Sequence, residues 1–90
     1  MTVYVDELRG YPNITGPAAR VGKRWCHLWA DGDVDELHAF ARGLGVKRRW
    51  YQGPRRHFGH YDLTPLRRRH AVEAGATEVR LKDYLRRRRA

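Results

Sequence analysis

Glycine and proline divide the chain into short segments, and each segment is long enough for only one strand or one short helix. Their densest run, around Pro12, Gly16 and Pro17, predicts a loop over residues 9–22. In a chain of 90 residues, such segments fit around one apolar core. The sequence therefore predicts a single small domain, residues 1–90.

Two segments in the first third of the chain have the composition of strands. Residues 2–5 are β-branched or aromatic, and residues 25–30 alternate between two faces. The alternation predicts one face with Trp25, His27 and Trp29, and an opposite face with Cys26, Leu28 and Ala30.

Two helices are indicated by their start signals. The first follows Asp33, a good N-cap residue, and carries an apolar stripe as far as about Gly43. The second begins at Thr64 and Pro65, which suit the N-cap and the first helical position, and ends at Gly75.

The remaining segments complete an alternating order. Residues 46–52 and 77–81 are predicted strands, and residues 82–89 are a predicted short helix. The resulting order is β-β-α-β-α-β-α, and short connections follow each helix, as in βαβ crossovers. The sequence thus predicts an α/β fold, a single small layer with a mostly parallel sheet, and a compact α+β arrangement is the alternative.

The charge is strongly positive and uneven. Nineteen Lys and Arg residues stand against ten Asp and Glu residues, which gives a formal net charge of +9. Residues 42–90 alone carry fifteen basic and four acidic residues, a net charge of +11, and end in an Arg-rich run at 86–90. Such a surface attracts polyanions, so a nucleic acid or a nucleotide is the expected partner. A codon preference for arginine on a solvated surface is the alternative.

Other compositional features narrow the class of protein. No apolar run approaches the roughly 20 residues of a membrane span, so we expect no membrane partner and a cytoplasmic location. Cys26 is the only cysteine, which excludes an internal disulfide and a multi-thiolate zinc site. A domain of this size has a small core, and a homodimer is one way to supplement it.

Open parallel sheets bind ligands beyond the carboxyl ends of their strands. Applied to the predicted strands, this rule brings polar residues from several segments to one rim. The residues expected there are Asp6, Asp31, Gln52, Arg55, Arg56, His57, His60, Tyr61 and Asp62. The convergence depends on the parallel sheet.

Five short motifs follow one another along the chain: Val5-Asp6, Cys26 to Asp31, Glu36 to Ala41, His60 to Pro65 and Ala74-Gly75-Ala76. In these motifs the chain resembles the domain of unknown function 4031 family, which is found in bacteria and their phages. The likeness covers most of the chain outside residues 12–22 and the Arg-rich end. It implies a shared fold, supplies no reaction, and emphasises six polar residues: Asp6, His27, Asp31, His60, Tyr61 and Asp62.

Two histidines and a carboxylate suit acid–base chemistry. If the protein is an enzyme, His27 and His60 are its candidate acid and base, with Asp62 to orient an imidazole. The structural alternatives are a half-buried His27 that only packs and an Asp62 that only caps the following helix.

Three carboxylates at strand ends suit a metal ion. Asp6, Asp31 and Asp62 are the residues that would hold Mg²⁺ or Mn²⁺, and otherwise no cofactor is expected. Aspartate is also common in turns for local hydrogen bonding, which is the alternative for Asp31.

The leading interpretation is a small basic binding module for a phosphate-bearing ligand, either nucleic acid or nucleotide. Arg48, Arg49, Arg55 and Arg56 would contact phosphates, and Trp50 or Tyr51 would stack on a base. The alternative is an enzyme that hydrolyses phosphodiesters or nucleotides, through the histidine pair or the three carboxylates. A basic adaptor for an acidic protein is a third possibility.

Overall fold

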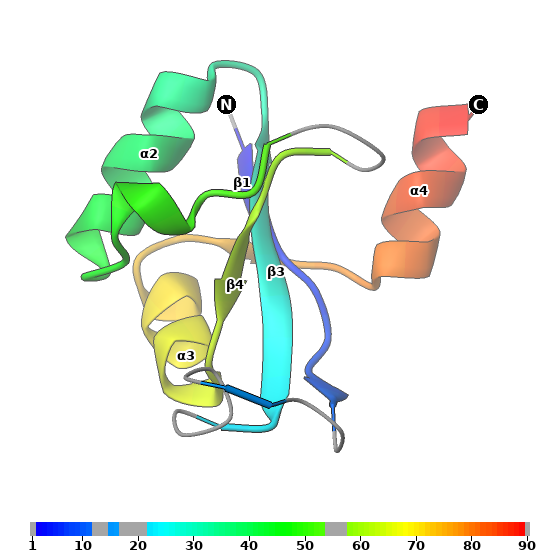
Figure 1. Ribbon diagram of the computed structural model, residues 1–90. Helices are drawn as coiled ribbons and strands as arrows, with labels where there is room; N and C mark the ends of the chain where they lie inside the picture. The colour runs from blue at the N-terminus through cyan, green and yellow to red at the C-terminus, as the bar shows by residue number, and fades with distance from the viewer. Residues whose placement is uncertain (1, 12–14, 17–21, 54–57, 90) are drawn as a thin grey trace.

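The computed structural model describes residues 2–11, 15–16, 22–53 and 58–89 (Figure 1). Its elements, in chain order, are β1 (Thr2–Val5), β2 (Arg9–Gly10), β3 (Arg24–Asp31), α2 (Val34–Gly43), the 3₁₀ helix η1 (Arg48–Trp50), β4 (Tyr61–Leu63), α3 (Pro65–Glu73), β5 (Thr77–Glu78) and α4 (Leu81–Arg89).

The sheet is mixed and mostly antiparallel, so the predicted parallel α/β layer is wrong and the fold is a small α+β one. Strand β3 pairs antiparallel with β1, β2 and β4, and only β1 with β5 is parallel. The prediction failed because the chain does not cross over after α2. It returns through η1 and enters β4 antiparallel to β3.

Two of the predicted strands also differ from the observed elements. Within residues 46–52, Arg48–Trp50 form η1, and only Gln52 pairs, in a bridge with His60. Only Val46 of this segment is buried, so it lacks the apolar face that a paired strand needs. The strand expected at 77–81 is limited to Thr77–Glu78, and α4 begins at Leu81, whose backbone N–H donates to the Glu7 carboxylate at 3.2 Å.

The two predicted helix starts are confirmed. The Asp33 carboxylate accepts the Asp35 backbone N–H at 2.9 Å at the start of α2. The Thr64 hydroxyl accepts the Arg67 N–H at 3.3 Å at the start of α3, where Pro65 needs no hydrogen bond of its own. Gly45 follows α2 with a φ of +78°, a conformation that favours glycine.

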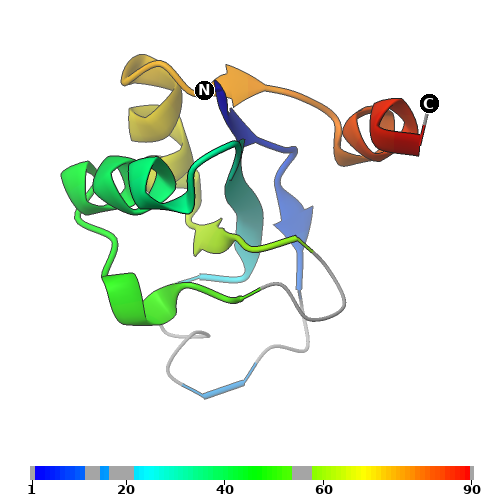
Figure 2. The ribbon, with the colours of Figure 1, turned by 90° about the horizontal axis from the view of Figure 1, so that it is seen from above.

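The sheet has two differently covered faces (Figures 1 and 2). Helices α2 and α3 lie on one face, over a core that includes Val5, Leu28, Leu63, Leu37 and Ala71. Helix α4 lies on the other side of the sheet, where Tyr84 meets Trp29 edge to face with ring centroids 5.0 Å apart. Of the helices in the described ranges, α4 alone lies on this second side.

One extra residue interrupts the pairing of β1 and β2 with β3. Three residues lie between Val5 and Arg9, whereas two lie between their partners Leu28 and Trp25. The result is a β-bulge that begins at Asp6. Arg68 of α3 holds it, since its Nε donates to the Asp6 carbonyl at 2.8 Å.

Candidate functional site

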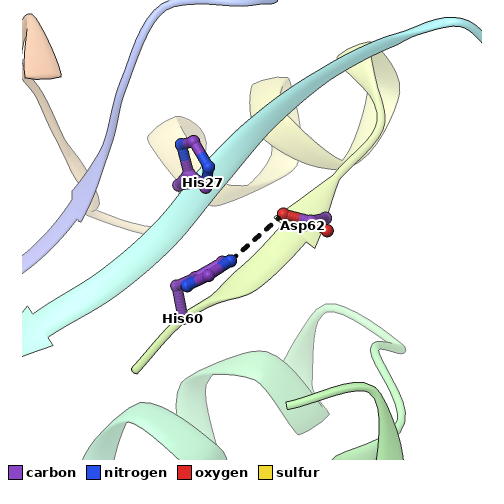
Figure 3. A group of neighbouring side chains, drawn as sticks. All are labelled: His27, His60 and Asp62. Atoms are coloured by element: carbon purple, nitrogen blue, oxygen red, sulfur yellow. Dashed lines mark ion pairs between the residues drawn. The ribbon is translucent and has the colours of Figure 1, made fainter. Parts of the chain in front are cut away.

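The register of β3 and β4 brings two predicted site residues onto one face of the sheet. His27 and Asp62 are directly paired positions, so their side chains point the same way. His60 precedes Asp62 by two residues and shares that face. Figure 3 shows the three side chains together, with the His60 imidazole directed at Asp62.

The bulge supplies the partner of His27. The Asp6 carboxylate accepts the His27 backbone N–H through Oδ1 at 2.6 Å and lies 2.6 Å from the imidazole Nδ1 through Oδ2. Asp6 is fully buried, whereas the His27 side chain is 22% exposed. Because a carboxylate can only accept, Nδ1 carries the hydrogen, and the free nitrogen of His27 is Nε2.

This hydrogen bond makes His27 more basic. The Asp6 hydrogen bond raises the pKa of His27 above its usual value, burial opposes the rise, and the Asp6 and Asp62 charges add to it. The carboxylate behind the imidazole therefore increases the electron density that Nε2 can offer to a proton or a metal ion.

His60 is oriented in the same sense by a different group. Its Nδ1 donates to the Phe58 backbone carbonyl at 3.0 Å, which leaves Nε2 as the acceptor nitrogen. Nε2 lies 3.6 Å from Asp62 Oδ1 (Figure 3). The two imidazole rings meet edge to face, with centroids 4.9 Å apart.

Asp62 is the exposed member of the group, with 41% of its side chain accessible. The Gln52 amide donates to Oδ2 at 2.6 Å, so Oδ1 is the oxygen left toward His60. Gln52, predicted as a ligand-binding residue, is placed here as a residue that orients a carboxylate.

His27, His60 and Asp62 lie close enough together to hold one metal ion. One donor atom from each lies within 4.8 Å of the other two. Two ligands about 2.1 Å from a tetrahedral ion lie about 3.4 Å apart, close to the 3.6 Å between His60 Nε2 and Asp62 Oδ1. Without a proton or a cation between them, these two acceptor atoms would repel each other.

The structure does not bring the three predicted carboxylates together. Among the residues that the structure describes, the group with metal-ligand spacing contains Asp62 but neither Asp6 nor Asp31. Asp31 lies at the far end of β3, where it accepts from the Thr2 N–H at 2.8 Å and the Tyr4 hydroxyl at 3.0 Å. The Thr2 hydrogen bond, more than that of Tyr4, lowers the pKa of Asp31.

Aromatic side chains border the cluster on one side. Phe58 and Tyr84 both contact Trp29, at ring-centroid distances of 5.0 Å, and Phe58 continues to His60 at 6.1 Å. Trp29 is buried beneath them. On the other side, Arg9 pairs across from Trp25, on the same face as His27, and its charge slightly lowers the pKa of His27. The same guanidinium forms an ion pair with the Glu7 carboxylate at 3.7 Å.

The remaining predicted ligand residues lie elsewhere. Arg48 stacks on Tyr51 at 5.2 Å, and Trp50, 42% exposed, has the Lys47 and Arg67 cations over its ring. Arg49 is exposed in η1. The Tyr61 side chain points away from the cluster, into the core. Arg55, Arg56 and His57 lie outside the described residues.

Sequence reasoning missed several residues that support the site. The Phe58 carbonyl that orients His60, and the Arg9 guanidinium beside His27, carry no local sequence signal. His38 of α2 was also missed, although its Nδ1 lies 2.7 Å from the Tyr61 hydroxyl. Only the pairing of distant segments reveals these contacts.

Comparisons with known proteins identify the family but no function. A family model described as "Protein of unknown function (DUF4031)" matches residues 3–90, which confirms the resemblance seen in the motifs. No curated protein and no solved structure matches the chain. None of the helices in the described part of the chain has the length and apolar composition to cross a membrane.

Proposed function

The chain belongs to the family described as Protein of unknown function (DUF4031), and we propose from its own residues that it is a metal-dependent hydrolase of phosphate esters. The observation that carries the proposal is the common orientation of His27 and His60. Each imidazole donates its Nδ1 hydrogen to an acceptor, so its Nε2 is free. Both imidazoles lie on the same face of the sheet as Asp62 Oδ1.

This orientation is typical of metal-ligating histidines. Such a histidine donates its other ring N–H to a carboxylate or a backbone carbonyl, which fixes the tautomer. His27 has the carboxylate of Asp6 and His60 has the carbonyl of Phe58. Both partners stand behind their imidazoles, which is the arrangement that a pre-formed site requires.

The donor set favours zinc over magnesium. Imidazole nitrogens suit Zn²⁺ and Fe²⁺, whereas Mg²⁺ prefers oxygen ligands. Catalytic zinc sites keep three protein ligands and an open position for water. His27, His60 and Asp62 would supply three ligands, and the exposure of Asp62 leaves access from solvent. The Mg²⁺ or Mn²⁺ expected from three aspartates does not suit this set.

A bound ion would supply a nucleophile, since it lowers the pKa of a coordinated water to about 7. An ion held by His27, His60 and Asp62 would thus activate water for attack on phosphorus, with cleavage of the bond from phosphorus to the leaving oxygen. The leaving oxygen takes up a proton from solvent. The ion's positive charge offsets the negative charge that develops on the phosphoryl oxygens.

The substrate class follows from charge. A formal net charge of +9 favours anionic substrates, and Arg9 lies on the site's face. The sequence predicts nucleic acids or nucleotides as partners, and both are phosphate esters, so we propose both as substrate classes.

The test is hydrolysis of bis(p-nitrophenyl) phosphate, a nucleotide panel and an oligonucleotide by protein stripped with EDTA and reloaded with Zn²⁺, Mn²⁺ or Mg²⁺. We expect turnover with Zn²⁺ and its loss in His60→Ala and Asp62→Asn. His70→Ala, at an exposed position on α3, is the matched control and should retain full turnover.

Two results would contradict the proposal. Turnover that survives EDTA but needs His27 and His60 would indicate metal-free acid–base catalysis. Absence of turnover with every metal and substrate, together with retained phosphate binding, would leave the binding module, which the basic charge alone supports.

A further inference from the structure

A second polar site lies on the opposite side of β4. Between α2 and the residues leading into η1 is an open hollow of about 550 Å³, a size suited to a small ligand. It is lined by Asp35, His38, Ala39, Arg42, Gly45, Val46, Lys47 and Arg48. The metal-site cluster contributes no residue to this lining.

The hydrogen bond between His38 and Tyr61 determines which way the His38 ring donates. The Tyr61 hydroxyl belongs to a fully buried residue and lies 2.7 Å from His38 Nδ1. Burial raises the pKa of Tyr61, so it keeps its proton. Because a buried hydroxyl proton needs an acceptor, we assign this proton to the hydrogen bond with His38 Nδ1. His38 Nε2 therefore carries the other hydrogen and can donate it.

Three of the polar groups in the hollow are held by aromatic rings. His38 meets Tyr51 edge to face at 4.7 Å, and the Arg48 guanidinium stacks on the same ring at 5.2 Å. The Lys47 ammonium lies 5.5 Å from the centre of the Trp50 ring. Side chains fixed in this way lose less conformational freedom when they bind a ligand.

The charges of the lining favour an anion. Arg42, Lys47 and Arg48 give three positive charges against the one negative charge of Asp35. The position of Arg42 can also be explained without a ligand, because a cation is favourable in the last turn of a helix. The helix dipole does not explain Lys47 and Arg48, which come after the helix and line the same hollow.

We propose that this hollow is a phosphate-binding pocket, in which His38 Nε2–H donates to a phosphate oxygen and Arg42, Lys47 and Arg48 supply the counter-charge. The phosphate belongs either to a nucleotide-sized ligand or to a nucleic-acid backbone. The proposal requires neither a metal ion nor hydrolysis, because its residues are separate from His27, His60 and Asp62.

The pocket is tested with three probes on the full chain: pyrophosphate, AMP and a short single-stranded oligonucleotide. Isothermal titration gives the dissociation constant, and amide chemical-shift changes show which residues respond. We expect saturable binding, with shifts over residues 38–48, and about a tenfold loss of affinity in Arg48→Ala, as for one charge-assisted hydrogen bond.

Variants separate binding in the pocket from attraction to the basic surface as a whole. Arg42→Gln, at an exposed position, should weaken binding while leaving the packing of Tyr51 intact. Arg69→Ala, an exposed arginine on α3, is the matched control and should leave AMP affinity unchanged. The titrations are run in EDTA, so that no metal ion at His27, His60 and Asp62 contributes to phosphate binding and a failed hydrolase does not decide the outcome for the pocket.

The oligonucleotide arm distinguishes the two sources of phosphate. Tighter, steeply salt-dependent binding of the oligonucleotide indicates a nucleic-acid backbone, and equal or weaker binding indicates a small ligand. No saturable binding of any probe overturns the proposal. So does an equal loss of AMP affinity in Arg69→Ala and Arg48→Ala, which would mean unlocalised charge attraction.

Discussion

His27 and His38 lie on opposite sides of the sheet and are both held through Nδ1, but by groups of opposite character. Asp6 Oδ2 lies 2.6 Å from His27 Nδ1, and the Tyr61 hydroxyl lies 2.7 Å from His38 Nδ1. The carboxylate can only accept, which leaves the His27 Nε2 as a lone pair. The buried phenol donates, which leaves the His38 Nε2 as an N–H.

The pKa values of the two histidines are also shifted in opposite directions. The Asp6 hydrogen bond raises the pKa of His27, whereas burial, and then the Arg48 charge, lower the pKa of His38. One imidazole is thus suited to a cation and the other to an anion. The group that contacts Nδ1 therefore determines whether the Nε2 of a histidine accepts or donates. Replacing that group should change what the histidine can bind.

The largest effect is expected from removing the partner of His27. Asp6→Ala removes a fully buried carboxylate that accepts from the His27 backbone N–H and from the imidazole Nδ1, so both donors lose their acceptor. We expect a loss of about 3 kcal/mol in the free energy of unfolding, measured by urea denaturation, together with loss of Zn²⁺ binding. Asp6→Asn is the matched control: it keeps one acceptor oxygen, so its loss of stability should be smaller. Equal losses would mean that the charge, rather than the hydrogen bonds, is what matters.

A smaller effect is expected from removing the partner of His38. Tyr61→Phe takes away the phenol proton, and the His38 Nδ1 loses its donor. We expect about 1 kcal/mol of destabilisation, a mixture of His38 tautomers in the ¹⁵N spectrum, and weaker AMP binding. Zn²⁺ affinity should not change, since Tyr61 points away from the cluster. A loss of Zn²⁺ binding would show that the two sides of β4 are coupled.

The pH dependence of stability should separate the two histidines by sign. The raised pKa of His27 gives stability that is full below about pH 6.5 and is lost as pH rises through its folded-state pKa. The lowered pKa of His38 gives stability that is present above about pH 6.5 and is lost as pH falls through its folded-state pKa.

In EDTA, the stability of the wild-type protein should decline toward high pH because of His27, and His27→Gln should abolish that decline. His38→Gln should likewise abolish the decline of stability toward low pH. Urea denaturation between pH 5 and 8 measures both, with His70→Gln as the exposed control. Slopes that change in the same direction in both variants would contradict the comparison.

The smallest effect is expected at Asp31, the third predicted carboxylate. Asp31→Asn keeps an oxygen for the Thr2 N–H at an exposed position. We expect the melting temperature to fall by less than about 3 °C, as for most surface substitutions, and Zn²⁺ affinity to stay the same. Loss of Zn²⁺ binding in this variant would instead identify Asp31 as a metal ligand.

The sequence predicted what local chemistry determines. The Asp33 and Thr64 caps start their helices as expected, and the alternation over residues 25–30 correctly placed Cys26 and Leu28 in the core, opposite His27. These features depend on neighbouring residues only, so a single sequence is enough to find them.

The sequence could not predict what depends on pairing between distant segments. The rim of a parallel sheet was the expected meeting place of His60 and Asp62, whereas an antiparallel β3–β4 register brings them together, beside His27. The bulge that buries Asp6 arises from one unmatched residue between β1 and β2, a register detail without a local signal. For the same reason, the His38–Tyr61 bond was not predicted.

Strand β1 lies between β3 and β5, and this position determines the order in which the molecule can fold. Val5 pairs with Glu78, 73 positions later in the chain, and Arg68 must reach the Asp6 carbonyl before the bulge is held. A contact across so many residues is slow to form, because the intervening chain must first be brought together. During synthesis β1, β3, α2 and β4 can associate early, whereas the contacts of Arg68 with the Asp6 carbonyl and of Glu78 with Val5 form only after α3 and β5 have left the ribosome.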